Sequence, residues 1–227
     1  GTYNFGSAPE LTYEETVTLE FLGGYDASGN RNAETNVTVF TGNKEHRIFN
    51  FGSEMQCKFD GINFVNGYAE KGGAIVASLG SYSFTGCSFS ENESVAGGGA
   101  ILFSAGGSAI FENCEFNNNE STPLSPDLDD KALGGTIYCN SNTTDLVLTF
   151  KGCVASDNTA YRGGFICSYG AKINIINSTL TGNESRRGGG VFYLSSAADL
   201  TVENCVFTEN KALYGATINA DSQVVVN

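Results

Sequence analysis

A short glycine-led motif recurs along the chain at nearly constant spacing, and this recurrence constrains the fold more than any other feature. The six copies begin at residues 72, 98, 134, 163, 189 and 215. A second block precedes each copy, and one column of its alignment holds Ile62, Cys87, Cys114, Cys153, Ser178 and Cys205. Successive blocks lie 25, 27, 39, 25 and 27 residues apart. Self-similarity at a fixed period predicts a continuous solenoid.

The long third step comes from one insertion at residues 121–132, and the other steps keep register. Residues 1–56 are less regular, but β-rich runs separated by turn residues predict opening coils of a different design. We therefore expect one domain, with opening coils over 1–56 and the repeat region over 57–227. The final residues 224–227, V-V-V-N, resemble the start of another strand and indicate a piece of a longer protein.

Apolar residues alternate with polar ones around the aligned column. The column five residues earlier holds Cys57, Tyr82, Ala109, Leu148, Ile173 and Leu200. The column three residues earlier holds Phe59, Phe84, Phe111, Phe150, Ile175 and Val202. The column two residues later holds Phe64, Phe89, Phe116, Ala155, Leu180 and Phe207. This alternation predicts strands with one buried face.

The residue before the aligned column is glycine or asparagine in every copy: Gly61, Gly86, Asn113, Gly152, Asn177 and Asn204. These residues tolerate a left-handed backbone, which predicts a sharp bend between two short strands. Segments between strands show no helical period, so no helix is available for a crossover. We predict an all-β fold, a single-stranded parallel β-helix of about eight coils of roughly 25 residues. A leucine-rich repeat is the alternative, because residues 200–207 fit its pattern.

Two polar columns carry structural predictions. Four of the seven cysteines share the aligned column, which predicts stacked unpaired thiols, with a Cys87–Cys114 disulfide as the alternative. The asparagine column holds Asn92, Asn119, Asn158, Asn183 and Asn210. Stacked amides donate to one another, so we expect a structural ladder. Asn92, Asn119 and Asn183 also begin N-x-S sequons, which leaves glycosylation open.

The net charge of −13, with only 12 Lys and Arg, argues against nucleic acid or an anionic membrane as a partner. No apolar run is long enough to span a bilayer.

Two motifs within the repeat carry a family resemblance. G-G-A-I stands at 72–75 and 98–101, and F-x-x-N stands as F-S-E-N at 89–92 and F-T-E-N at 207–210. Together they resemble the repeat of chlamydial-type polymorphic membrane proteins and related bacterial surface proteins, over roughly residues 57–220. The first copy departs from this pattern, with F-V-N-G at 64–67. The resemblance implies a right-handed β-helix that is secreted or displayed on the bacterial cell surface, adhesin-like in some relatives.

Parallel β-helices also include polysaccharide lyases and glycoside hydrolases, so catalysis is the alternative function. The N-T-D and G-H-G motifs of polygalacturonase-like hydrolases are absent. Asp127, Asp129 and Asp130 in the insertion could bind a calcium ion through their carboxylate oxygens. Their spacing matches no calcium-binding loop, so we expect no cofactor. The single histidine, His46, lies among charged residues. We therefore assign no catalytic residue and favour a protein that is not an enzyme.

Lys71, Arg162, Arg187 and Tyr214 precede the corner glycines, the last three on consecutive coils. Two guanidinium groups and a ring at one-coil spacing fit an acidic or planar sugar, so Arg162, Arg187 and Tyr214 are the candidate ligand-binding residues. Ion pairs with Glu184 and its neighbours are the structural alternative. The sequence thus favours a non-catalytic, adhesin-like β-helix that presents a repetitive face to a glycan or cell-surface partner; a structural stalk is a third hypothesis.

Overall fold

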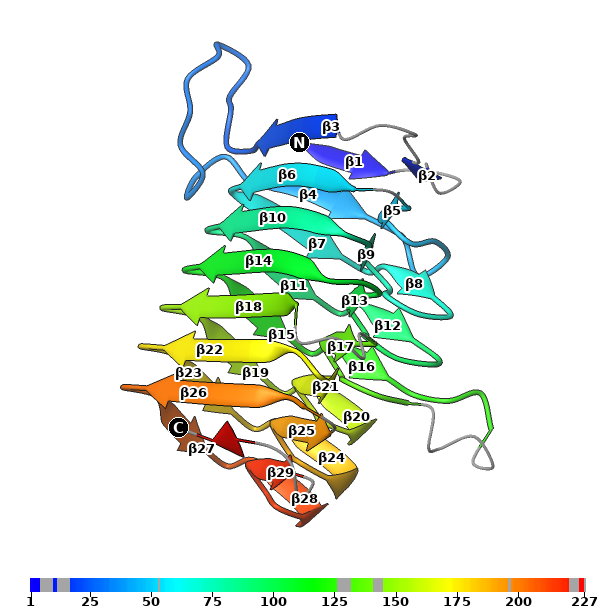
Figure 1. Ribbon diagram of the computed structural model, residues 1–227. Helices are drawn as coiled ribbons and strands as arrows, with labels where there is room; N and C mark the ends of the chain where they lie inside the picture. The colour runs from blue at the N-terminus through cyan, green and yellow to red at the C-terminus, as the bar shows by residue number, and fades with distance from the viewer. Residues whose placement is uncertain are drawn as a thin grey trace.

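The computed structural model describes residues 1–4, 10–11, 17–52, 54–125, 132–140, 145–195, 197–220 and 225–226. The chain forms a stack of parallel coils with the N-terminal coil at the top of the view in Figure 1. Four parallel sheets run along the stack, numbered here in the order in which each coil visits them.

The first sheet contains, in order, β3 (Val17–Leu22), β6 (Met55–Asp60), β10 (Gly80–Thr85), β14 (Gly107–Glu112), β18 (Leu146–Lys151), β22 (Lys172–Ile176), β26 (Asp199–Glu203) and β30 (Val225–Val226). The second contains β1 (Thr2–Asn4), β4 (Thr38–Thr41), β7 (Ile62–Val65), β11 (Ser88–Ser90), β15 (Glu115–Asn117), β19 (Val154–Ser156), β23 (Thr179–Thr181) and β27 (Val206–Thr208). The third contains β8 (Tyr68–Ala69), β12 (Glu93–Ser94), β16 (Glu120–Ser121), β20 (Thr159–Arg162), β24 (Glu184–Gly188) and β28 (Lys211–Tyr214). The fourth contains β2 (Glu10–Leu11), β5 (Phe49–Phe51), β9 (Ile75–Ala77), β13 (Ile101–Phe103), β17 (Ile137–Cys139), β21 (Ile166–Tyr169), β25 (Phe192–Ser195) and β29 (Ile218–Ala220).

Six coils contain a strand of every sheet, and partial coils lie at both ends. The predicted parallel β-helix is therefore confirmed, although the expected number of about eight coils is slightly too high for complete ones. The described residues include no helix, so the leucine-rich repeat alternative, whose convex side would carry helices or apolar turns, is wrong.

The apolar columns of the repeat stack directly on one another. The register pairs Phe84 with Phe59 and with Phe111, one coil to either side. The rings of Phe84 and Phe111 are nearly parallel, at 5°, with centroids 4.8 Å apart. A second stack joins Phe64 to Phe89 at 4.7 Å. These rings are buried and form the centre of a continuous core, in which offset stacking adds to the burial of apolar area.

Left-handed backbone marks the bend in each repeat, as predicted. The residues Gly61, Gly86, Asn113, Gly152, Asn177 and Asn204 all have φ between 50° and 66°. This conformation costs most residues about 1–2 kcal/mol, which explains why only glycine and asparagine occupy the position. The bend turns the chain from the first sheet into the second.

All seven cysteines are unpaired, so the Cys87–Cys114 disulfide alternative is wrong. The Cys114 thiol instead donates to the carbonyl oxygen of Phe84 on the preceding coil, at 3.4 Å. The neighbouring thiols of Cys153 and Cys87, followed by burial, raise the pKa of Cys114. Burial alone raises the pKa of Cys57 to about 12. Since the thiolate is the reactive form, these buried cysteines are chemically inert.

This burial predicts a sharp difference in thiol reactivity. We expect Cys205, which is only half-buried, to be the one cysteine that an alkylating reagent modifies in the folded protein at pH 8. All seven should react in urea, and mass spectrometry of both samples would count the adducts. Modification of Cys114 in the folded protein, or a mass lower by two hydrogens, would contradict the unpaired buried column.

The asparagine column forms the predicted hydrogen-bonded ladder. Asn119 Nδ2 donates to Asn158 Oδ1 at 3.0 Å and to the carbonyl oxygen of Phe89 at 2.9 Å. Asn92 Nδ2 donates to Asn119 Oδ1 in the same way. Asn92, Asn119 and Asn183 have no exposed surface, so their sequons are inaccessible to glycosylation in the folded protein.

Candidate functional site

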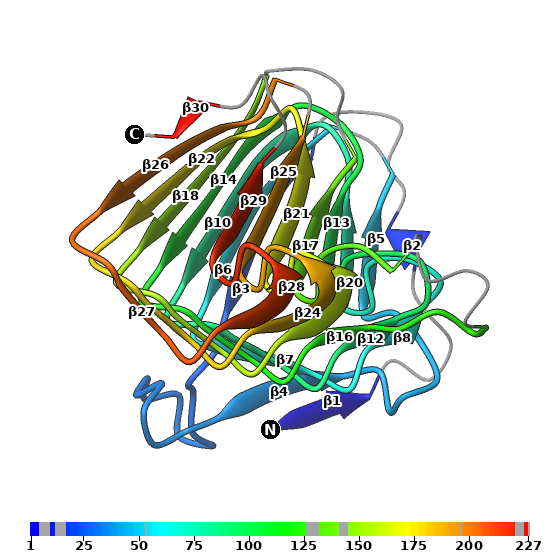
Figure 2. The same cartoon turned by 90° about the horizontal axis from the view of Figure 1, so that it is seen from below.

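The three candidate ligand-binding residues lie on consecutive strands of the third sheet. Arg162 ends β20, Arg187 lies in β24 and Tyr214 ends β28. Figure 2 shows these strands at the C-terminal end of the stack, next to β21 and β25 of the fourth sheet. Lys71, the fourth residue of the predicted set, lies three coils away and is not part of this surface.

A β-bulge in β24 corrects the predicted alignment of these residues. Arg162 pairs in register with Gly188, and Gly188 pairs with Tyr214. Arg186 and Arg187 of β24 therefore together lie opposite a single residue of each neighbouring strand. In the sequence, Arg187 comes directly before three consecutive glycines, so the prediction aligned it with Arg162 and Tyr214. The extra residue of the bulge puts Gly188 at that position instead. Bulges of this kind redirect side chains and are frequent next to functional sites.

The arginines are held by tyrosine rings. The guanidinium carbon of Arg162 lies 5.3 Å from the ring centroid of Tyr161 and 5.3 Å from that of Tyr193. Arg187 Nη1 donates a hydrogen bond to Tyr161 Oη at 3.2 Å. Tyr161, Arg162, Arg187, Tyr193 and Tyr214 are called the arginine–tyrosine cluster below. The structure thus brings the predicted residues together through two tyrosines that the sequence analysis did not identify.

The electrostatics of the cluster follow from this geometry. The hydrogen bond to Tyr161 raises the pKa of Arg187, and the nearby Tyr214 and Tyr193 raise it further. The Tyr214 side of the cluster faces solvent, because this tyrosine is 56% exposed. The arginines therefore stay charged at every physiological pH and are open to a ligand from the Tyr214 side.

Apolar and aromatic side chains on the outer face of the fourth sheet continue from the cluster. The ring centroids of Tyr169 and Tyr193 lie 6.4 Å apart, and those of Tyr138 and Tyr169 lie 6.1 Å apart. Tyr138 is only 8% exposed, and burial raises its pKa to about 12. These packed rings give Tyr193, and through it Arg162, a fixed support.

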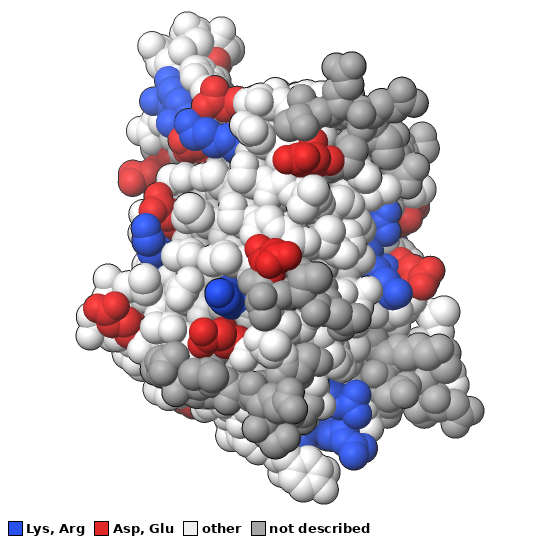
Figure 3. Space-filling view, viewed as in Figure 1, with Lys and Arg blue, Asp and Glu red and all other residues white. Residues whose placement is uncertain are grey.

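Arg162 and Arg187 form no ion pair with a described residue, and the same holds for Lys44, Lys71, Lys172 and Lys211. Carboxylates pair with Arg31, Lys58, Lys151 and His46. Within the described ranges, no ion pair joins Arg162 or Arg187 to Glu184 or to another carboxylate. Figure 3 shows basic side chains gathered over the C-terminal coils, in the lower part of the view.

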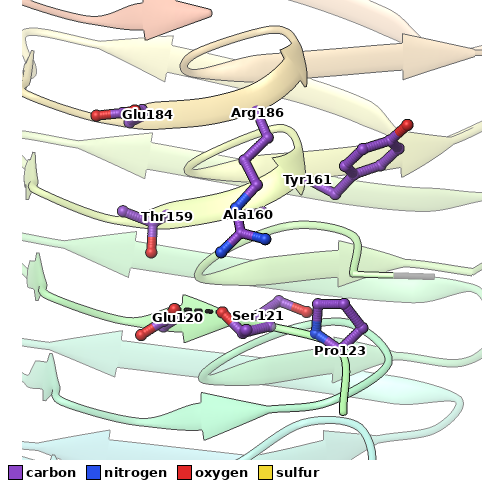
Figure 4. A pocket seen from close by; sticks show the side chains of 9 residues that line it. Glu120, Ser121, Pro123, Thr159, Ala160, Tyr161, Glu184 and Arg186 are labelled. Atoms are coloured by element: carbon purple, nitrogen blue, oxygen red, sulfur yellow. Dashed lines mark hydrogen bonds between the residues drawn. The ribbon is translucent and has the colours of Figure 1, made fainter. Parts of the chain in front are cut away.

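A pocket of about 250 Å³ adjoins the cluster on the third sheet. Its lining consists of Glu120, Ser121, Thr122, Pro123, Thr159, Ala160, Tyr161, Glu184 and Arg186. In Figure 4 the Arg186 side chain extends across Ala160 towards Ser121 and Pro123, while Tyr161 points away. The Glu120 carboxylate accepts a hydrogen bond from the Thr122 hydroxyl. The pocket therefore presents the carboxylates of Glu120 and Glu184 and the guanidinium of Arg186 to a polar molecule of monosaccharide size.

Two other predicted features give no site in the described residues. Asp127, Asp129 and Asp130 lie outside them, so the structure does not test calcium binding there. Elsewhere, the described part of the chain contains no group of three His, Cys, Asp or Glu side chains that could hold a metal ion. His46 Nε2 lies 3.9 Å from a carboxylate oxygen of Glu45, a surface contact.

Stacked parallel coils with four sheets define a β-solenoid. Residues 26–207 match the family model for the right-handed β-helix region, and the chain belongs to this family. No curated protein and no solved structure matches the chain. Among the residues that the structure describes, no helix is long and apolar enough to cross a membrane.

Proposed function

We propose that this chain is a non-catalytic, adhesin-like β-helix that binds glycans through the arginine–tyrosine cluster. The observation that carries the proposal is the Arg162 guanidinium between the rings of Tyr161 and Tyr193, without a carboxylate partner among the described residues. Tyrosine rings offer flat apolar faces to the C–H surfaces of sugars, and guanidinium groups donate several hydrogen bonds to their oxygens.

The fold supports binding to a repeating partner. The coils lie about 4.8 Å apart, so successive strands present side chains along the stack at a regular interval. Weak contacts to a glycan with many equivalent units add when the presenting surface is stiff. The continuous phenylalanine core and the asparagine ladder provide this stiffness.

We also propose that the protein is secreted or displayed on a bacterial cell surface. The G-G-A-I and F-x-x-N motifs support this location through their resemblance to polymorphic membrane protein repeats. The net charge of −13 disfavours nucleic acid as a partner.

One observation supports a second function, that of a polysaccharide lyase or glycoside hydrolase with a pectate-lyase-like fold. Glu120 pairs in register with Thr159, and Thr159 pairs with Glu184, so the two glutamates lie two coils apart beside the pocket. Two coils correspond to a backbone separation of about 10 Å, close to the carboxylate spacing of inverting hydrolases. The insertion beside this pocket is where calcium would be sought in such an enzyme.

Binding and turnover assays on one oligosaccharide panel distinguish the two functions. We expect the protein to retain glycans and to release neither reducing nor unsaturated sugars. Tyr214→Ala should weaken binding about fivefold, because an exposed aromatic contact contributes roughly 1 kcal/mol. Lys172→Ala, a change on the exposed first sheet, should have no effect. Sugar release that Glu120→Gln abolishes would establish the enzyme instead.

A further inference from the structure

We infer that the arginine–tyrosine cluster binds the carboxylate of an acidic sugar, so that the glycan ligand contains uronic-acid or sialic-acid-type residues. The inference rests on the proposed function and names the ligand class for the same site. Three observations lead to it: the bulge that brings Arg187 to Tyr161, the lack of an ion pair between Arg162 or Arg187 and any described carboxylate, and the contacts of these two guanidinium groups with tyrosines.

The bulge in β24 adds a cation at this corner of the solenoid. The register moves from Ala160–Ser185 to Arg162–Gly188, so two residues of β24 stand opposite the single residue Tyr161. Both of these residues are arginines. Arg186 extends along the pocket, whereas Arg187 contacts the hydroxyl of Tyr161. The guanidinium groups of Arg162 and Arg187 therefore converge on the same tyrosine.

Arg162 and Arg187 contact tyrosine side chains, whereas Lys58 and Lys151 contact carboxylates. The sequence has 25 Asp and Glu against 12 Lys and Arg, so carboxylate partners are abundant. Lys58 and Lys151 have such partners, at 2.7 Å and 3.4 Å. For Arg162 and Arg187, the contacts in the described residues are with tyrosines. Both guanidinium groups thus keep hydrogen-bond donors available for an anion.

The ring contacts make the site suited to a sugar acid. The Arg162 guanidinium is half-buried, so it interacts more strongly with an anion than one in open water, because the effective dielectric constant is lower; Arg187 is exposed. The planar guanidinium fork matches the two oxygens of a carboxylate in a bidentate pair. Tyr214, exposed beside Arg187, provides a face on which the sugar ring can pack.

Matched pairs of acidic and neutral sugars test the ligand class. The probes are 3′-sialyllactose against lactose, glucuronate oligosaccharides against glucose oligosaccharides, and a sulfated oligosaccharide, each titrated by calorimetry. We expect each carboxylate sugar to bind at least about 10-fold more tightly than its neutral partner, with an affinity that falls as salt rises. The sulfated sugar should bind less tightly than the carboxylate sugars.

Variants assign the preference to the cluster. Arg162→Gln and Arg187→Gln should each lower affinity for the acidic sugars about 10-fold and affinity for the neutral sugars by a clearly smaller factor, because only the acidic sugars lose the charged pair. Arg187→Lys should restore part of the loss, because it keeps the charge without the planar fork. Lys172→Gln removes one positive charge from the first sheet and should change nothing. Far-ultraviolet circular dichroism and thermal unfolding would show that each variant is folded.

The outcomes separate the inference from the proposed function. Equal binding of acidic and neutral sugars overturns the inference while the glycan-binding proposal stands. The same holds if the sulfated sugar binds most tightly, or if Lys172→Gln matches the effect of the cluster variants. Absence of binding to every sugar overturns both.

Discussion

Gly99→Ala should prevent the chain from reaching its stacked fold. A methyl group at Gly99 would overlap the carbonyl oxygen of Gly135 on the next coil and lie 2.6 Å from the carbonyl oxygen of Glu120. Both obstacles are backbone atoms, which cannot move without separating the coils. We expect the free energy of unfolding to fall by more than about 4 kcal/mol. Few kinds of point mutation destabilise a protein this much, and a steric clash with backbone atoms is one of them. Urea unfolding and the yield of soluble protein would measure the loss.

Gly86→Asn is the matched control. Gly86 has φ of 55°, and a Cβ there meets no atom within 4 Å. Asparagine occupies the same column with the same backbone at Asn113, Asn177 and Asn204. The stability of Gly86→Asn should therefore stay within about 0.5 kcal/mol of the parent. A Gly99→Ala variant as stable as Gly86→Asn would disprove the close approach of the coils.

Asn119→Leu should lower the free energy of unfolding by about 4 kcal/mol. The Asn119 amide accepts from Asn92 Nδ2 at 2.9 Å and from the Asn92 backbone at 3.2 Å. It also donates to the carbonyl oxygen of Phe89 at 2.9 Å. Leucine has nearly the same size but leaves these buried polar groups without that partner, and each orphaned group costs about 1–3 kcal/mol. Urea unfolding monitored by circular dichroism gives the change.

Asn174→Ala provides the comparison for this ladder. Asn174 lies on the outer face of β22, and its hydrogen bond to Thr149 is long, at 3.4 Å. Its replacement should change stability by less than about 0.5 kcal/mol. If Asn119→Leu were equally mild, the asparagine column would have no structural role, and its recurrence would need another explanation.

The fold could be predicted from the sequence because every coil repeats the same physical requirement. The glycine or asparagine at each bend, the phenylalanine stacks and the amide ladder all appear as single columns, and the register confirms them. A column that keeps one kind of residue through five or six copies has few interpretations. The stacked arrangement of the thiols followed for the same reason.

The candidate site was less predictable because it joins residues from different columns. Tyr161 and Tyr193 belong to the third and fourth sheets, and no alignment within one column brings them together. The bulge in β24 is a departure from the repeat, and three successive glycines concealed it. The core shows a similar limit at Phe165, whose ring packs against Phe116 and Phe150 from other columns. Only the spatial arrangement reveals such contacts.

A crystal structure of the protein with 3′-sialyllactose would test the central claim most directly. We expect the sugar carboxylate to lie within hydrogen-bonding distance of the Arg162 and Arg187 guanidinium groups, with a sugar ring against Tyr214. A sugar bound instead between Glu120 and Glu184, with Arg162 and Arg187 unoccupied, would contradict the assignment of the arginine–tyrosine cluster as the ligand-binding surface.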